Sequence, residues 1–247
     1  MPKLSEIKTE GNLKVLIIGH PGSGKTVLAA SFPGPILYLD FDNKVDSAAL
    51  FFKDQPELLE QVEVRQLSAG LTADPIADFN KLITTELIPQ QRDGKMKYKT
   101  IVIDSISSFS WAALMHILNT NPGIKGVVTS QGKMTDQTHY GVLLREFKRL
   151  IPGMLTLPCN IVMCAHIDIY KSETGEIVRE AAMDGSYSQK LPQVFKEVWA
   201  LRADDKGKRF VQTQPDRQFA FLRSQIPGLP RELDVTDGYE AIAKYLK

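Results

Sequence analysis

Short runs of apolar, β-branched residues recur along the chain and alternate with amphipathic segments. Such runs are typical of strands that are buried on both faces of a sheet. They lie at residues 14–18, 36–39, 100–104 and 160–166, with a less apolar extended run at 62–65. Helical patterns occupy residues 25–32, 46–54, 74–88, 107–119, 139–155 and 236–246. This alternation predicts an α/β fold with a mainly parallel central sheet flanked by helices.

The last third of the chain departs from this alternation. Strand-like runs between residues 197 and 225 are separated by Asp204-Asp205-Lys206-Gly207, which is a hairpin turn signal. We therefore expect an antiparallel extension at one edge of the sheet. Because no repeat, low-complexity segment or linker divides the chain, residues 1–247 are interpreted as a single domain with a loose lead-in at residues 1–12.

A phosphate-binding motif directly follows the first apolar run and opens the first helix. It fits GxxxxGK[ST] at every fixed position and consists of Gly19, His20, Pro21, Gly22, Ser23, Gly24, Lys25 and Thr26. The glycines permit positive φ, so that backbone N–H groups can surround a phosphate at the start of the helix. Lys25 is expected to reach the β- and γ-phosphates and Thr26 to bind Mg²⁺ through its hydroxyl. The motif predicts ATP with Mg²⁺ as the ligand.

Composition and charge exclude only a few classes of function. The net charge is +1, so any contact with DNA has to be local rather than the result of a global positive field. The two cysteines, Cys159 and Cys164, lie in one apolar stretch and are interpreted as buried residues of a reducing compartment. We find no signal-peptide pattern and no run long enough to span a membrane, so a cytoplasmic location is expected.

A second carboxylate is needed to organise the bound magnesium. Asp104 ends the apolar run at 100–104, where the corresponding aspartate of P-loop proteins lies. The alternative is that Asp104 caps the helix at 107–119. We favour the magnesium role because the phosphate-binding motif precedes it.

The acidic run after the strand at 36–39 is open to two interpretations. Asn43-Lys44-Val45-Asp46 spells NKxD, the motif with which GTPases recognise guanine. It comes too early in the chain for that role, and no DxxG follows, so we interpret it as coincidental. The other interpretation is a strand-end carboxylate beside the γ-phosphate, or acidic residues that cap the next helix.

The order of these features resembles the RecA-like branch of P-loop ATPases. In particular, it resembles the small phage-encoded RecA-like ATPases of the phage nucleotide-binding family, which are linked to single-strand annealing and recombination. The resemblance covers residues 12–225 and includes the phosphate-binding motif, the run LYLDFDNKVD, Asp104-Ser105, the strand NIVMCAH and the late QTQPD…FLRS segment. It implies a RecA-like ATPase core and a location in the bacterial host cytoplasm.

The resemblance also implies roles for four more residues. Asp42 falls where the family carries its catalytic glutamate, and Asp40 is the fallback base. His166 corresponds to the polar residue that contacts the γ-phosphate, although a lone histidine at a strand end is commonly only a solvated residue. Arg223 resembles the arginine finger that such assemblies insert into a neighbouring ATP site, although it could equally be a surface charge.

Two polar stretches correspond to the loops that hold DNA in RecA-like recombinases. Residues 122–138 are expected to form a long loop, and 168–190 a second polar region that could contain a hairpin. Cations for the DNA backbone are Lys125, Lys133, Lys171, Arg179 and Lys190, and Tyr170 and Tyr187 are candidates for base stacking. The second stretch also holds four acidic residues, as a solvated surface loop would.

Two functions therefore remain open. The first is a Mg²⁺-dependent ATPase that binds single-stranded DNA, assembles as a homo-oligomeric filament or ring, and acts in phage recombination, annealing or repair. A single-strand-binding protein is a further expected partner. The alternative is a nucleotide-gated interaction or assembly module that binds ATP but no DNA. A small-molecule kinase is a weaker third choice, because the arginine-rich lid expected of one is missing from the sequence.

Overall fold

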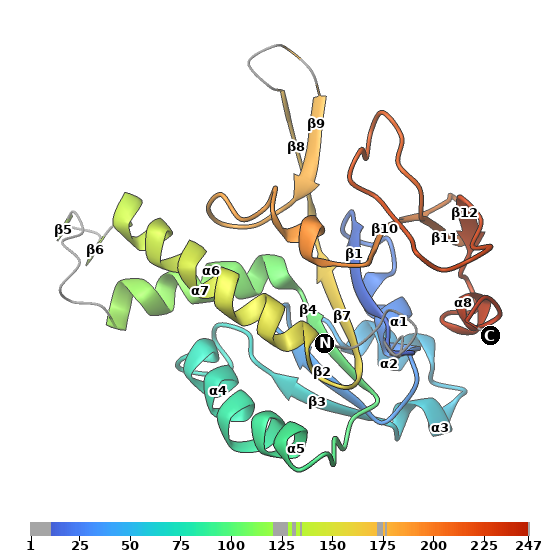
Figure 1. The fold of residues 1–247 in the computed structure, drawn as a ribbon, viewed down its shortest axis with the longest axis horizontal. Helices are drawn as coiled ribbons and strands as arrows, with labels where there is room; N and C mark the ends of the chain where they lie inside the picture. Colours follow the sequence, from blue (N-terminus) through green and yellow to red (C-terminus); the bar gives the residue numbers. More distant parts are fainter. Residues whose placement is uncertain are drawn as a thin grey trace, which may run out of the picture.

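The structure is a computed structural model that describes residues 11–120, 128–129, 132–133, 135–171, 175 and 177–246. Its main sheet contains six parallel strands: β1 (Lys14–Gly19), β2 (Ile36–Asp40), β3 (Val62–Gln66), β4 (Thr100–Asp104), β7 (Asn160–Ala165) and β10 (Glu197–Ala203). Two antiparallel strands follow, β11 (Arg209–Gln212) and β12 (Glu232–Asp234). The strand order is β12-β11-β10-β1-β7-β4-β2-β3 (Figure 1). The predicted fold class, including the antiparallel edge, is confirmed.

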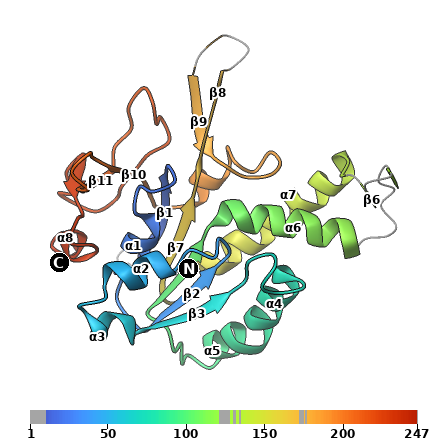
Figure 2. The ribbon, with the colours of Figure 1, turned by 180° about the vertical axis from the view of Figure 1, so that it is seen from behind.

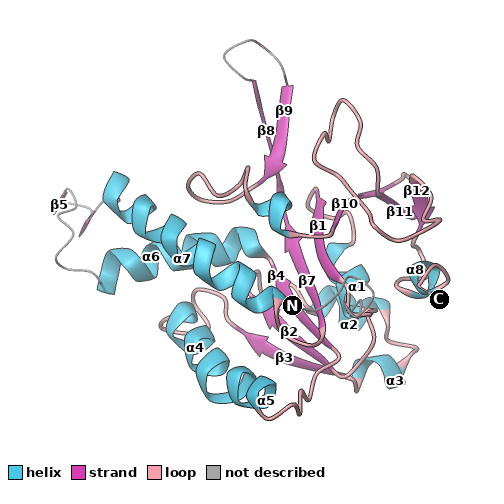
Figure 3. Cartoon of the chain, viewed as in Figure 1, coloured by secondary structure: helices cyan, strands magenta, loops and turns pink. Residues whose placement is uncertain are grey.

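Helices cover both faces of this sheet (Figure 3). One face carries α4 (Pro75–Leu82), a π-helical turn (Ile83–Leu87), α5 (Ile88–Arg92), α6 (Ile106–Thr120) and α7 (Gln137–Leu155). The other face carries α1 (Lys25–Ala30), α2 (Asp46–Phe51), α3 (Pro56–Leu59) and α8 (Glu240–Ala243). Within β1, Leu16 and Ile18 pack on the first face and Val15 and Ile17 on the second. Burial on both faces explains why this strand is continuously apolar.

Two small hairpins lie outside the main sheet. One pairs β5 (Val128–Thr129) with β6 (Gly132–Lys133), and the other pairs β8 (Ile167–Lys171) with β9 (Ile177–Ala181). The β8–β9 hairpin continues from the end of β7 and projects beyond the body of the molecule in both views (Figures 1 and 2). The hairpin that the sequence left open within 168–190 is therefore present.

The boundaries of several elements differ from the expected ones. The helix expected at 74–88 is divided by the π-helical turn and runs on to Arg92. α7 begins at Gln137, because the Asp136 side chain accepts hydrogen bonds from the backbone N–H groups of Thr138 and His139. The closing helix shortens to Glu240–Ala243, and β12 is an additional strand that the sequence pattern did not indicate.

The sequence also led to expectations about the cysteines, the N-terminal lead-in, the domain organisation and membrane-spanning segments. Cys159 and Cys164 are both buried, as predicted, and burial raises the pKa of the Cys159 thiol to about 11. Residues 1–10, most of the expected lead-in, lie outside the described residues, and the single-domain interpretation stays a prediction. Among the described residues, none of the helices is both long and apolar enough to cross a membrane.

Candidate nucleotide-binding site

The phosphate-binding loop connects β1 to α1 in a tight turn. Gly22 and Gly24 have φ angles of 79° and 94°, which are in the left-handed region that favours glycine. At Gly19 a Cβ atom would lie 2.5 Å from the Ser23 hydroxyl and 2.7 Å from the Leu201 carbonyl oxygen. Glycine is therefore required at these positions by backbone conformation or by close packing, as the motif predicts.

Lys25 lies inside the loop. Its ammonium group donates hydrogen bonds to the carbonyl oxygens of Gly19 at 2.8 Å and His20 at 3.0 Å. The side chain is buried, and this burial lowers the pKa of the Lys25 ammonium. Both of these partners are neutral carbonyl groups, so an anionic phosphate in the loop would find this charge already in place.

Thr26 and Asp104 meet at the base of the loop. The Thr26 hydroxyl donates to Asp104 Oδ2 at 2.6 Å, and the Tyr38 hydroxyl donates to the same oxygen at 2.6 Å. The backbone N–H of Ser108 in α6 donates to the Ser105 hydroxyl at 3.2 Å, so the residue after Asp104 provides a side-chain acceptor for the first turn of the helix. The two oxygen donors fit magnesium, which commonly takes one or two protein ligands and completes its shell with phosphate and water. The Asp104–Ser105 peptide bond is cis.

The two strand-end aspartates after β2 have different surroundings. Asp40 is buried, and its carboxylate accepts hydrogen bonds from the backbone N–H groups of Asp42, Lys44 and Val45 at 3.0–3.3 Å. Burial raises the pKa of the Asp40 carboxyl, and these hydrogen bonds act in the opposite direction. Asp40 therefore shapes the segment that leads into α2, whose first residue is Asp46, while the N-cap residue Val45 makes no side-chain cap.

Asp42 instead faces side chains. Ser105 Oγ donates to its Oδ1 at 2.9 Å, and His166 Nε2 lies 3.1 Å from its Oδ2. Burial raises the pKa of the Asp42 carboxyl, but hydrogen bonds from His166, Ser108 and Ser105 outweigh it and hold the pKa well below its ordinary value. Since an ionised carboxylate can only accept, His166 Nε2 carries the hydrogen of this bond.

A single pocket of about 530 Å³ unites these groups. Lys25, Thr26, Asp42, Asp104 and His166 all line it, together with Gly22 and Gly24 of the loop. The structure therefore brings together five site residues that are spread over residues 25–166. Asp40 is absent from the lining of this pocket, within the described residues.

Arg209 is a pocket residue that the sequence analysis missed. Its side chain lies so close to Gly24 that a Cβ atom there would collide with it. Its guanidinium carbon is 4.4 Å from the centre of the Phe51 ring, and Nη1 is buried without a hydrogen-bond partner in the described part of the chain. Burial lowers the pKa of the Arg209 guanidinium. No local signal marks Arg209, because it reaches the loop only through the position of β11.

Arg223 lies away from this pocket. Its backbone pairs with Val198 of β10, which is level with Leu16 in the middle of β1 rather than with the loop at its end. The guanidinium donates to the Pro192 carbonyl oxygen at 3.0 Å. The structure does not bring Arg223 to the nucleotide pocket of its own chain, and an action on a neighbouring chain stays a prediction.

The run Asn43-Lys44-Val45-Asp46 borders the same pocket. Lys44 and Asp46 line it, and Asn43 adopts a φ of 54°. Lys44 is a further cation near the loop that the sequence analysis did not assign. The expected preference for ATP over GTP stays a prediction.

The expected DNA-binding residues are only partly placed by the structure. Lys125 lies outside the described residues, and Lys133 is part of β6, but its side chain is outside the description. Lys171 and Lys190 are exposed, and Arg179 lies over the Phe219 ring at 5.7 Å. Lys171 and Arg179 therefore share the β8–β9 hairpin, while Lys190 precedes the 3₁₀ turn Leu191–Val194.

The two tyrosines proposed for base stacking differ in outcome. Tyr187 is 2% exposed and packs with its ring centre 5.7 Å from that of Phe147, so the stacking role is wrong for it in this structure. Tyr170 is exposed on β8. It pairs with Val178, while Arg179 pairs with Ile169, and side chains of successive strand residues point to opposite faces. Tyr170 and Arg179 thus lie on opposite faces of the hairpin.

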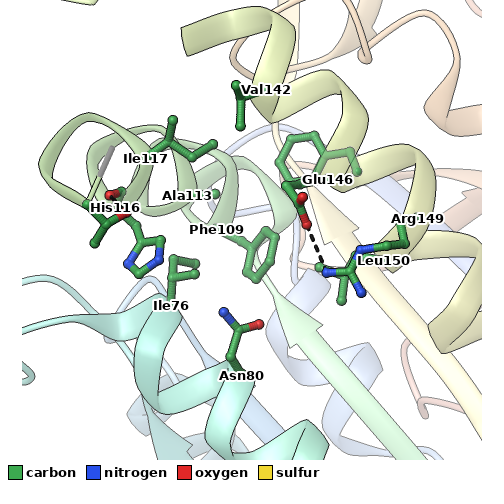
Figure 4. A pocket seen from close by; sticks show the side chains of 12 residues that line it. Ile76, Asn80, Phe109, Ala113, His116, Ile117, Val142, Glu146, Arg149 and Leu150 are labelled. Atoms are coloured by element: carbon green, nitrogen blue, oxygen red, sulfur yellow. Dashed lines mark hydrogen bonds and ion pairs between the residues drawn. The ribbon is translucent and has the colours of Figure 1, made fainter. Parts of the chain in front are cut away.

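A second cavity, of about 240 Å³, lies between α4, α6 and α7 (Figure 4). Its floor is mostly apolar, and Glu146 and Arg149 form an ion pair at its rim (Figure 4). His116 Nδ1 lies 2.7 Å from the carboxylate of Asp74, which caps α4. None of the phosphate-binding residues lines this cavity, so its contacts point to helix packing rather than to the nucleotide chemistry.

A comparison with known families finds a match that includes the residues of the pocket. Residues 11–220 match a family model described as an AAA domain. The matched range contains every residue of the nucleotide pocket named above, Arg209 included. No curated protein matches the chain.

Proposed function

Since the chain belongs to the AAA domain family, a family of P-loop ATPases, we propose that it is a Mg²⁺-dependent ATPase in which Asp42 is the general base. The observation that supports it best is the pairing of Thr26 with Asp104 at the loop, beside Asp42 in one pocket. Thr26 and Asp104 would hold the magnesium ion, which supplies charge neutralisation for the phosphates. Lys25 binds the β- and γ-phosphates.

Asp42 has the contacts that a base for the attacking water requires. It is ionised over the physiological range, because the hydrogen bonds to it outweigh the effect of burial on its pKa. His166 fixes one carboxylate oxygen and Ser105 the other, so the orientation of the carboxylate is set by the residues that directly follow β7 and β4. His166 is thereby a positioning residue for Asp42, at the place where a polar side chain next to the γ-phosphate was expected.

Arg209 supplies a positive charge from within the same chain. Its side chain lies against Gly24 of the phosphate-binding loop, and its Nη1 has no hydrogen-bond partner among the described residues. A guanidinium is suited to bind phosphate oxygens in the plane of its donors. In this proposal Arg209 binds the nucleotide, and Arg223 remains a candidate finger for the site of a neighbouring subunit in a homo-oligomer.

We further propose single-stranded DNA as the partner and recombination, annealing or repair as the process. The exposed Lys171 and the half-buried Arg179 on the projecting β8–β9 hairpin support this proposal, because cations on a protruding arm can neutralise DNA phosphates. The alternative, an assembly module that binds ATP without DNA, shares the nucleotide pocket and differs only in the partner.

The test is hydrolysis of ATP and GTP by the purified chain, with Mg²⁺ or EDTA and with or without single-stranded DNA. We expect Mg²⁺-dependent hydrolysis that prefers ATP, and a decrease of at least ~10²–10³-fold in Lys25→Ala, because the transferring phosphoryl group loses a charge partner. The exposed Lys53 on the same side of the sheet provides the control variant Lys53→Ala, which should keep full activity.

Full hydrolysis by folded Lys25→Ala protein would exclude the ATPase proposal. Hydrolysis that is unaffected by DNA, together with no detectable DNA binding, would favour the assembly module instead. A clear preference for GTP that disappears in Asp46→Ala would restore the guanine-recognition interpretation of residues 43–46.

A further inference from the structure

A third cavity, which we call the Trp111 groove, adjoins the nucleotide pocket. It has a volume of about 570 Å³ and is bordered by the ends of β2 and β3 and by the first turns of α6. Asp42, Lys44 and His166 line both cavities. The groove thus begins where the nucleotide pocket ends, on the side of the proposed base.

The outer wall of the groove is apolar and exposed. Trp111 on α6 is 53% exposed and Leu71 is 56% exposed, and both line the groove. A tryptophan side chain is among the most costly to leave in water, and an exposed indole at a cavity is a surface on which a flat ring can stack. The packing of α6 does not account for it, because the helix buries its opposite face through Phe109 and Ala113.

Two polar residues on the inner side of the groove have buried side-chain atoms without hydrogen-bond partners in the described part of the chain. Ser68 is 7% exposed, and its hydroxyl is buried with no hydrogen-bond partner among the described residues. The Nδ1 atom of His166 is in the same situation, while its Nε2 is bonded to Asp42. Buried polar groups are normally satisfied, and each unsatisfied one costs free energy. Since both residues line the groove, a ligand with its own donors and acceptors would satisfy these atoms once the side chains turn toward it.

These features narrow the class of ligand. A wholly apolar ligand would leave Ser68 and His166 unpaired. A divalent cation would find a single carboxylate in the lining, that of Asp42, and a free phosphate would find a single cation, Lys44. A flat heteroaromatic ring with hydrogen-bonding edges fits both walls, and the volume lies within the range of about 300–1,000 Å³ that is usual for small-molecule sites.

We propose that the Trp111 groove binds a nucleobase, stacked on Trp111 and hydrogen-bonded by Ser68 and His166. The base can be part of single-stranded DNA or of a free nucleoside, and both present the same chemistry. In the first case the inference rests on the proposed function and places DNA next to the γ-phosphate end of the nucleotide pocket. A base that is bonded to His166 Nδ1 also fixes the imidazole that orients Asp42, which links occupation of the groove to hydrolysis.

Intrinsic fluorescence provides a direct test, because the chain contains two tryptophans and Trp199 is fully buried. The nucleotide pocket is first filled with Mg²⁺ and a non-hydrolysable ATP analogue. The protein is then titrated with oligo(dT), with an abasic oligonucleotide of the same length, and with thymidine. We expect saturable quenching by oligo(dT) and a much weaker response to the abasic strand. Trp111→Phe should remove the quenching while it keeps the binding of labelled oligo(dT).

Trp111→Ala is expected to weaken oligo(dT) binding by about 5- to 100-fold, the range found for loss of one base-stacking side chain. Tyr140→Ala is the matched control, since Tyr140 is an exposed aromatic residue on α7, outside the groove and outside the β8–β9 hairpin. Unchanged melting temperature in both variants confirms that they are folded.

The outcomes separate this inference from the proposed function. If oligo(dT) binding depends on Tyr170 or Lys171 but not on Trp111, the groove proposal is overturned and DNA binding stands. If thymidine quenches Trp111 saturably and no oligonucleotide binds, the groove stands with a free nucleoside as its ligand and DNA binding falls. If neither ligand produces quenching that depends on Trp111, the groove proposal is overturned.

Discussion

The nucleotide pocket and the Trp111 groove adjoin each other and share three residues, yet they are built in different ways. In the nucleotide pocket the charged groups of Lys25, Asp42 and Asp104 are held by short hydrogen bonds to neighbouring groups. The groove is lined by an exposed indole and by two residues whose buried polar atoms have no partners in the described part of the chain. The first arrangement is prepared for a highly charged ligand, and the second for a flat and nearly neutral one.

The difference follows from how each cavity is formed. A phosphate site needs several donors at fixed positions, and a tight turn after a buried strand provides them within eight successive residues. The groove is assembled from three separate segments, around residues 41–44, 67–71 and 107–112, with His166 from a fourth. A cavity of this kind depends on the sheet order, because β3 and β4 lie on either side of β2.

The largest predicted effect is on ATP hydrolysis, and it comes from Asp42, which lines both cavities. Asp42→Asn should retain nucleotide binding and reduce hydrolysis by at least ~10²-fold, because the attacking water loses its base. Asp40→Asn should chiefly lower the melting temperature, since the Asp40 carboxylate accepts three backbone N–H groups. The measurements are single-turnover hydrolysis, binding of a fluorescent ATP analogue and thermal unfolding. An active Asp42→Asn protein and a folded but inactive Asp40→Asn protein would move the base by two residues.

A smaller effect, on nucleotide affinity, is expected from Arg209, which also lines the nucleotide pocket. Arg209→Ala should weaken binding of the ATP analogue by about 10-fold at protein concentrations where the chain is monomeric, the scale of a lost charged hydrogen bond. Arg223→Ala is the control and should bind normally under the same conditions. Equal affinities for the wild type and Arg209→Ala would mean that Arg209 does not contact the nucleotide.

Arg223 is tested in the same series by mixing subunits. If Arg223 acts on a neighbouring site, a mixture of Lys25→Ala and Arg223→Ala chains should recover part of the activity that neither has alone. A wild-type monomer that hydrolyses ATP at its full rate at every protein concentration, with or without DNA, would contradict that role.

The smallest effect is the pH dependence of stability due to Asp42. Its pKa is lower in the folded chain than the ordinary value of about 3.9. Ionisation of Asp42 therefore stabilises the fold above pH ~4, and this contribution is lost as the pH falls through the folded-state pKa. The melting temperature of Asp42→Asn should lie about 2–4 °C below that of the wild type at pH 7, the shift for roughly 1 kcal/mol in a chain of this length. The difference should narrow below pH 4 in calorimetry, whereas a difference that widens on acidification would contradict the assigned direction.

The sequence by itself determined the features that depend on neighbouring residues. The apolar runs identified the strands of the central sheet, and the spacing from Gly19 to Thr26 identified the phosphate-binding loop, because both patterns are imposed by local backbone geometry. The pairing of Thr26 with Asp104 could also be expected, since parallel strands place their carboxyl ends at one edge of the sheet. The turn at residues 204–207 likewise identified the antiparallel edge.

Only the tertiary structure decided which distant residues join the site. Arg209 reaches the loop because β10 pairs with β1 and β11 pairs with β10, an order that no local pattern encodes. The same order leaves Arg223 level with the middle of β1, and the packing against α7 buries Tyr187. The Trp111 groove was not predictable either, because a tryptophan on a helix is exposed or buried according to which face packs on the sheet. The chemistry of each side chain follows from the sequence. The surroundings that give it a function arise from contacts between residues more than a hundred positions apart in the chain, such as His166 and Asp42.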